Sequence, residues 1–142
     1  MKGHVMRIVG IVLFVAAFFV PAVRAPGTGA GTGSFAGWVC ALAALMSTAG
    51  LLHLGAAGQG KDTVGIISLI LSGWVNPLVL LFLAFSIRPR WVRARRALTA
   101  AVLVCLAATW LFLFKAPMVP LVGHFLWVAG IAAILVAEFT KG

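Results

Sequence analysis

Five long apolar runs, separated by short polar or glycine-rich segments, dominate the hydrophobicity pattern of this chain. None of the runs alternates apolar and polar residues as a barrel strand does, and a helix needs about 20 apolar residues to cross a bilayer. The pattern therefore predicts an all-α fold, an integral membrane bundle of about five transmembrane helices in a single domain. The expected helices cover residues 5–23, 35–55, 63–87, 97–114 and 120–139.

The segments between the runs carry typical turn and linker residues. Residues 25–34 read APGTGAGTGS, which predicts a flexible linker, and two prolines close to Lys115 predict a tight turn before the last helix. The first run has the basic start and apolar centre of a secretory signal, but Pro26 follows the best cleavage pattern, Val23-Arg24-Ala25. We therefore expect a retained helix here.

Composition agrees with a membrane protein. Of the 142 residues, 63% are hydrophobic and 9% are charged, and the mean hydropathy is +1.18. Soluble domains are about half apolar and about a quarter charged. A soluble fold of this composition has too little polar surface to cover its apolar residues, whereas lipid removes that requirement.

The net charge of +9 comes from 11 basic and 2 acidic residues. Five arginines gather in one loop between apolar runs, so membrane topology and anionic lipid headgroups explain the charge better than nucleic acid, and no nucleic-acid partner is expected. They are Arg88, Arg90, Arg93, Arg95 and Arg96. The loop is expected to face the cytoplasm, which with five crossings puts the N-terminus outside and the C-terminus inside. Lys2 and Arg7 oppose this orientation, and a re-entrant second or third segment would resolve the conflict differently.

Small residues recur at spacing four in three of the expected helices. This spacing places each set along one helix face, where close backbone approach favours packing inside the bundle or against partner helices. The sets are Ala36, Cys40, Ala44 and Thr48; Ala97, Ala101, Cys105 and Thr109; and Ala129, Ala133 and Ala137. The two cysteines are interpreted as small packing residues.

Polar residues also recur inside the third run, where Ser68, Ser72 and Asn76 are spaced by four and Pro77 follows. Proline lacks an N–H group and frees the carbonyl of Gly73, which predicts a kink. The polar side chains then either satisfy freed backbone groups and neighbouring helices or line a site for a neutral solute.

Two histidines, His53 and His124, are expected near the same membrane face. Together they are candidate axial ligands of a haem, and either alone is a candidate ligand of a chlorophyll-type pigment. The alternative is that each forms a hydrogen bond at the interface or between helices. No metal-ligand cluster accompanies them, so no metal site and no obligatory cofactor are predicted.

The two acidic residues, Asp62 in a turn and Glu138 near the end of the last run, do not lie mid-membrane. No nucleophile–base pair and no phosphate-binding loop is evident, so the chain is not expected to be an enzyme.

The third run and the loop after it resemble a group of small, uncharacterised bacterial inner-membrane proteins. The resemblance rests on Trp74-Val75-Asn76-Pro77, the leucine-rich stretch 78–83, the arginine-rich loop and Gly123-His124-Phe125-Leu126-Trp127, in which His124 replaces an expected aromatic residue. It covers residues 73–137 and implies a bacterial inner-membrane location without implying an activity.

Three functions follow as hypotheses. The first is a non-catalytic accessory or structural subunit that packs within a larger complex of membrane proteins. The second is a small transporter or channel for a neutral solute. The third is a haem- or chlorophyll-binding subunit of an electron-transfer or light-harvesting complex.

Overall fold

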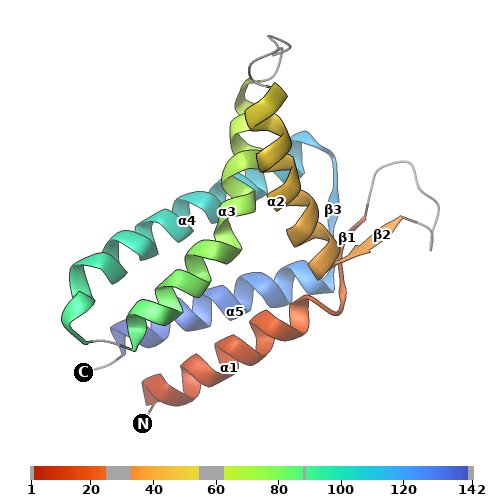
Figure 1. Ribbon diagram of the computed structural model, residues 1–142. Helices are drawn as coiled ribbons and strands as arrows, with labels where there is room; N and C mark the ends of the chain where they lie inside the picture. Colours follow the sequence, from red (N-terminus) through yellow and green to blue (C-terminus); the bar gives the residue numbers. More distant parts are fainter. Residues whose placement is uncertain (1, 25–32, 55–62, 88, 141–142) are drawn as a thin grey trace. The chain divides into compact units, whose positions relative to one another are not determined.

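The computed structural model describes residues 2–24, 33–54, 63–87 and 89–140 (Figure 1). Its elements in chain order are α1 (Lys2–Ala17), β1 (Pro21–Arg24), β2 (Ser34–Ala36), α2 (Gly37–Leu54), α3 (Thr63–Ser86), the 3-10 helix η2 (Pro89–Trp91), α4 (Val92–Lys115), β3 (Val119–Pro120) and α5 (Val122–Phe139). The chain divides into two compact units. The first comprises Met1–Cys40 and Pro117–Gly142, and the second Ala41–Ala116.

The first unit is built on an antiparallel pair of helices, α1 and α5, which lie side by side (Figure 1). Gly3 near the start of α1 lies against Ala137 and Thr140 at the end of α5, and Gly123 at the start of α5 lies against the carbonyls of Val20 and Pro21. The pairing therefore extends along both helices. Consequently the first turn of α1 and the last turn of α5 lie at the same end of the unit.

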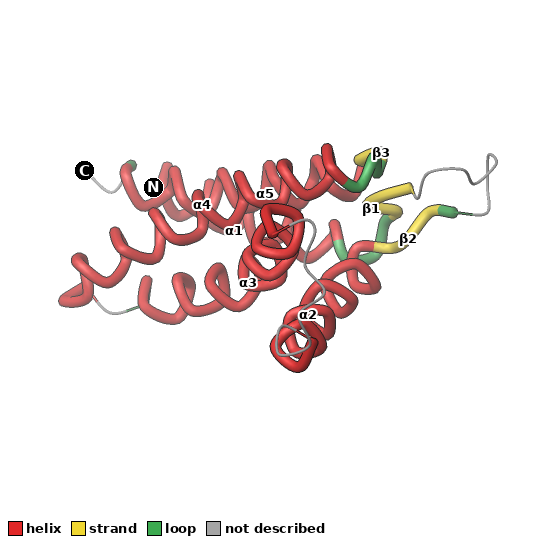
Figure 2. Tube along the Cα trace, turned by 90° about the horizontal axis from the view of Figure 1, so that it is seen from above, coloured by secondary structure: helices red, strands yellow, loops and turns green. Residues whose placement is uncertain are grey.

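A small antiparallel sheet, of order β2-β1-β3, closes the other end of this unit (Figure 2). Val23 of β1 pairs with Phe35 of β2 and with Pro120 of β3. The sequence pattern did not predict the sheet, and the expected helix at 5–23 ends earlier, at Ala17. Pro21 explains the difference, because its ring cannot continue the helix and its missing N–H is tolerated at the start of a strand.

The start of α2 is attached to the turn that follows α1. The amide of Gly37 donates to the carbonyl of Val20 at 3.1 Å, and the amide of Trp38 donates to the carbonyl of Phe18 at 3.0 Å. Helix N-termini leave several backbone amides without helical partners. Two of these amides in α2 are thus satisfied by the chain just beyond α1.

The second unit contains the hairpin of α3 and α4, joined through η2 (Figure 1). Val75, Val79 and Phe82 of α3 and Val102 of α4 are almost fully buried. The helix α4 begins at Val92, five residues before its expected start at 97, so that three arginines of the predicted loop form part of the helix. The helix α3 continues past Pro77 to Ser86.

Three of the described helices, α3, α4 and α5, are long and apolar enough to cross a membrane. Shorter apolar stretches cover Gly3–Ala17 in α1 and Gly37–Met46 in α2. The predominantly helical architecture and the membrane character expected from the sequence therefore hold.

Candidate functional site

Small residues at spacing seven line the contact between α1 and α5. On α1 they are Gly3, Gly10 and Ala17, and on α5 they are Gly123, Gly130 and Ala137; all six are buried. These two sets were not predicted, because the small residues that stood out in the sequence were those at spacing four. Ala129, Ala133 and Ala137 were expected on one packing face, but Ala129 is exposed and Ala133 is half-buried, whereas Ala137 is buried.

The two backbones approach each other closely at Gly10 and Gly130. A Cβ atom on Gly130 would lie 2.6 Å from the amide nitrogen of Phe14, and one on Gly10 would lie 2.9 Å from the carbonyl oxygen of Gly130. Neither distance leaves room for a side chain of any size. Such close approach lets dispersion forces stabilise a helix pair in lipid, where apolar burial contributes little.

An ion pair lies near one end of the same contact. Arg7 of α1 donates from Nη2 to Oε2 of Glu138 on α5 at 3.0 Å, and the two side chains are 19% and 16% exposed. Both residues were noted in the sequence, Arg7 as a topology signal and Glu138 as one of two acids, but their pairing was not anticipated. The pair neutralises two charges that would otherwise be costly in an apolar setting.

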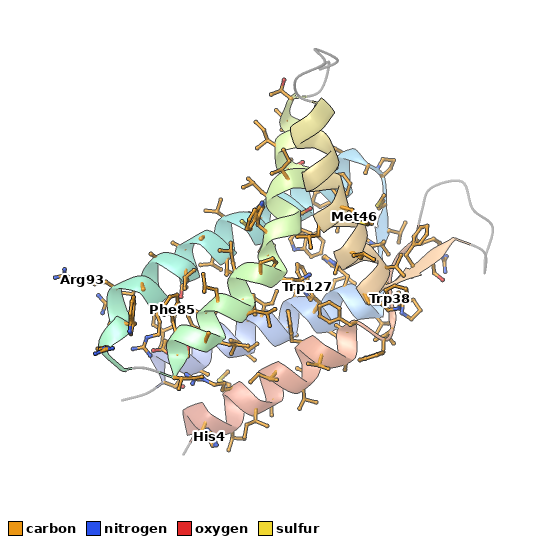
Figure 3. The ribbon with its side chains drawn as sticks, viewed as in Figure 1. His4, Trp38, Met46, Phe85, Arg93 and Trp127 are labelled. Carbon is orange, nitrogen blue, oxygen red and sulfur yellow. The ribbon has the colours of Figure 1, made fainter. Side chains whose placement is uncertain are left out.

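His124 is buried in the first turn of α5, with its ring centre 5.5 Å from that of Trp127 and 6.2 Å from that of Phe125. Figure 3 shows Trp127 on the same helix. The other predicted ligand, His53, belongs to α2 in the second unit, and its side chain lies outside the described residues. The pairing of the two histidines as haem ligands therefore stays a prediction.

The polar residues of α3 are engaged mostly within their own helix. The hydroxyl of Ser68 donates to the carbonyl of Gly65 at 2.9 Å, and that of Ser72 donates to the carbonyl of Leu69 at 2.8 Å. Ser68 is buried, while Ser72, Asn76 and Pro77 are half-buried. These serine bonds follow the local pattern by which hydroxyls are satisfied inside apolar helices.

The same local pattern recurs in α4. The hydroxyl of Thr99 donates to the carbonyl of Arg95, and that of Thr109 donates to the carbonyl of Cys105. Cys105 is buried and Cys40 is half-buried, and neither forms a disulfide. These bonds leave the threonine hydroxyls of α4 engaged with their own helix.

The arginine cluster begins in η2 and continues into the first turn of α4. Arg90, Arg93 and Arg96 are exposed and Arg95 is buried, while Arg88 lies outside the described residues. Figure 3 shows Arg93 extending away from α4. Cations in the first turn of a helix oppose its macrodipole, at a cost of about 0.3–1 kcal/mol each. Helix stability therefore does not account for their position.

Two further faces emerge from the pattern of exposure. The outer face of α5 consists of Val122, Phe125, Ala129, Ala132, Val136 and Phe139. The outer face of α4 consists of Ala97, Ala100, Val104, Ala107, Leu111 and Phe114. All twelve residues are exposed, and both faces repeat at alternating spacings of three and four, as in left-handed helix packing. Each face contains alanines, Ala129 and Ala132 on α5 and Ala97, Ala100 and Ala107 on α4.

Comparison of the chain with protein-family models, with curated proteins and with solved structures gives no match. Among the residues that the structure describes, no three histidine, cysteine or acidic side chains form a group that would hold a metal ion. The candidate site is therefore a set of helix faces: the contact between α1 and α5, and the two outer faces.

Proposed function

We propose that this chain is a multi-pass, non-catalytic subunit that packs against other membrane proteins, with the bacterial inner membrane as its location. The exposed alanine-containing faces of α4 and α5 carry the proposal. The chain joins α1 to α5 through a face of small residues, and the exposed outer faces of α4 and α5 also carry small residues that a further helix could approach. Small residues at such positions favour association of transmembrane helices.

The engagement of the described polar groups also supports a packing role. Four hydroxyls of α3 and α4, those of Ser68, Ser72, Thr99 and Thr109, bond to their own helices, and Arg7 is paired with Glu138. A solute path needs polar groups that are offered to the solute rather than to the helix backbone. The transporter and the pigment-binding subunit therefore remain weaker proposals.

Anionic lipid headgroups are the second partner that we propose, at Arg90, Arg93 and Arg96. These arginines are exposed and lie at the N-terminal end of α4, where the helix macrodipole disfavours positive charge. Attraction to a negatively charged membrane surface would explain both features.

The packing role is tested by purifying tagged protein in a mild detergent from its native membranes. Wild type is compared with Ala129→Leu/Ala132→Leu on the outer face of α5 and with Ala100→Leu/Ala107→Leu on that of α4. Added side chains should block close approach of a partner helix, so at least one double variant should insert and fold but lose the membrane proteins that accompany wild type.

A matched control is Ala84→Leu, an exposed alanine of α3 next to the exposed Leu80 and Leu81. Its partners should be retained, because a lipid-facing helix tolerates a larger apolar residue. A wild-type protein that purifies alone, or variants that keep every partner, would contradict the proposed role.

A further inference from the structure

The antiparallel contact of α1 and α5 constrains how the chain crosses the membrane. Gly3 and Gly10 of α1 lie against α5, and Gly123 at the start of α5 lies against Val20 and Pro21, just past the end of α1, so α1 runs along α5 for its whole length. A membrane that α5 crosses is therefore also crossed by α1, in the opposite direction. The start of α1 and the end of α5 must then lie at the same face of the membrane.

Chain connections settle the directions of the other long helices. Five residues, Ile87–Trp91, join α3 to α4, and six residues, Ala116–Leu121, join α4 to α5. At about 3.3–3.6 Å per residue neither connection spans a hydrocarbon core of about 30 Å. The start of α3, the end of α4 and the start of α5 therefore share one face, and the end of α1 shares it too.

The remaining helix, α2, begins after α1 ends and precedes α3. Both of those points lie at the same face, so the segment that contains α2 must return to the face from which it started. Its first amides bond to the carbonyls of Phe18 and Val20, which keeps its start beside the end of α1. A helix satisfies its own backbone polar groups, so an apolar α2 can enter the bilayer without crossing it.

We infer that the chain crosses the membrane four times, through α1, α3, α4 and α5, that α2 is re-entrant, and that both termini lie in the cytoplasm with the arginine cluster. This replaces the five crossings and the external N-terminus expected from the sequence. It rests on the proposal that the long helices span a membrane.

The charges agree with this arrangement and remove the conflict at the N-terminus. Eight of the eleven basic residues are then cytoplasmic, including Lys2, Arg7 and Lys141, against seven in the five-crossing arrangement. Charge alone separates the two arrangements by one residue. The pairing of α1 with α5 therefore decides between them.

Single cysteines test the inference in a variant without Cys40 and Cys105, labelled in intact cells with a maleimide that does not cross the inner membrane. With four crossings, Lys2→Cys should not be labelled and Gly29→Cys should be labelled efficiently. Five crossings predict the reverse at both sites. Val92→Cys, protected in both arrangements, and Gln59→Cys, labelled in both, are the matched controls.

Lysis should restore labelling at Lys2→Cys, which shows that the residue was shielded by the membrane. Labelling of Lys2→Cys in intact cells together with protection of Gly29→Cys would overturn the inference, as would the same result at both sites. Release of the chain from membranes by alkaline carbonate would instead contradict the proposal that it is a multi-pass membrane subunit. The two failures are thus distinguishable.

Discussion

In the second unit, α3 and α4 follow one another along the chain and bury large side chains such as Val79, Phe82 and Val102. In the first unit, the partners α1 and α5 are joined by an ion pair between residues 131 positions apart, and their backbones meet at Gly10 and Gly130. A hairpin brings its two helices together through a short connection. Helices that are distant in sequence have no short connection to hold them together. In the α1–α5 pair, glycines that face each other and one pair of opposite charges provide the specificity instead.

The largest expected effect is at the glycine contact. Gly130→Leu should separate α1 from α5, because even a Cβ atom there would lie 2.6 Å from the backbone of Phe14. A disulfide between Gly3→Cys and Thr140→Cys in the cysteine-free protein reports the pairing, since a Cβ on Gly3 lies 3.0 Å from the Thr140 hydroxyl. We expect this cross-link to disappear.

The neighbouring exposed residue supplies the control. Ala129→Leu adds a similar side chain one position away, on the outer face of α5, and should leave the cross-link intact. Equal cross-linking in Gly130→Leu and Ala129→Leu would mean that the pair does not depend on close backbone approach.

A smaller loss is expected when a large side chain is removed from the second unit. Phe82 is fully buried, and Phe82→Ala should lower the free energy of unfolding in detergent by about 2 kcal/mol. This is less than the usual cost in soluble cores, because lipid-like surroundings remove much of the transfer contribution. Circular dichroism during thermal unfolding measures the effect, and Leu80→Ala, on the exposed side of α3, should have little influence.

Removing the ion pair should lower the free energy of unfolding by a smaller amount than Phe82→Ala. Glu138→Gln leaves the Arg7 guanidinium without its carboxylate, but the side chain is 19% exposed and lies near the helix end, where it can extend to the polar interface, so we expect a loss of about 1 kcal/mol. The exchanged variant Arg7→Glu/Glu138→Arg should recover part of that loss. A double variant less stable than either single one would show that the charges do not act as a pair.

The smallest effect is expected at the serines of α3. Because the hydroxyl of Ser72 bonds to Leu69 of its own helix, Ser72→Ala should change the free energy of unfolding by less than about 0.6 kcal/mol. Transport assays in vesicles on Ser72→Ala and Asn76→Leu address the alternative function. Solute uptake by wild type that is lost in either variant, while unfolding is unchanged, would favour the transporter over the packing subunit.

The helical content was predictable because each helix corresponds to a continuous apolar run in the sequence. The limits of α2, α3 and α5 lie within two residues of those expected from the hydrophobicity pattern. The errors fall where a local signal was misread: hydrophobicity continues from Phe18 to Val23, although the helix ends before Pro21, and arginines at 93–96 are helical although they are charged. Hydropathy reports burial in lipid, and it does not by itself separate a helix from a short strand.

The candidate site was less predictable. The glycines of α1 and α5 are visible in the sequence, but spacing seven within each helix does not say which helices pair. His124 shows the same limit, since its burial beside Trp127 follows a local spacing of three, whereas a partnership with His53 required a long-range arrangement. Pairing of Arg7 with Glu138 depended equally on which helices meet.

By itself, the sequence determined that this chain consists of apolar helices suited to lipid, because composition and run length are properties of each segment alone. Only the tertiary structure decided that α1 pairs with α5, that small strands close one end of that pair, and that Arg7 meets Glu138. Choosing among apolar helices depends on shape and charge complementarity between distant segments, since hydrophobicity is nearly the same for every possible pair in lipid.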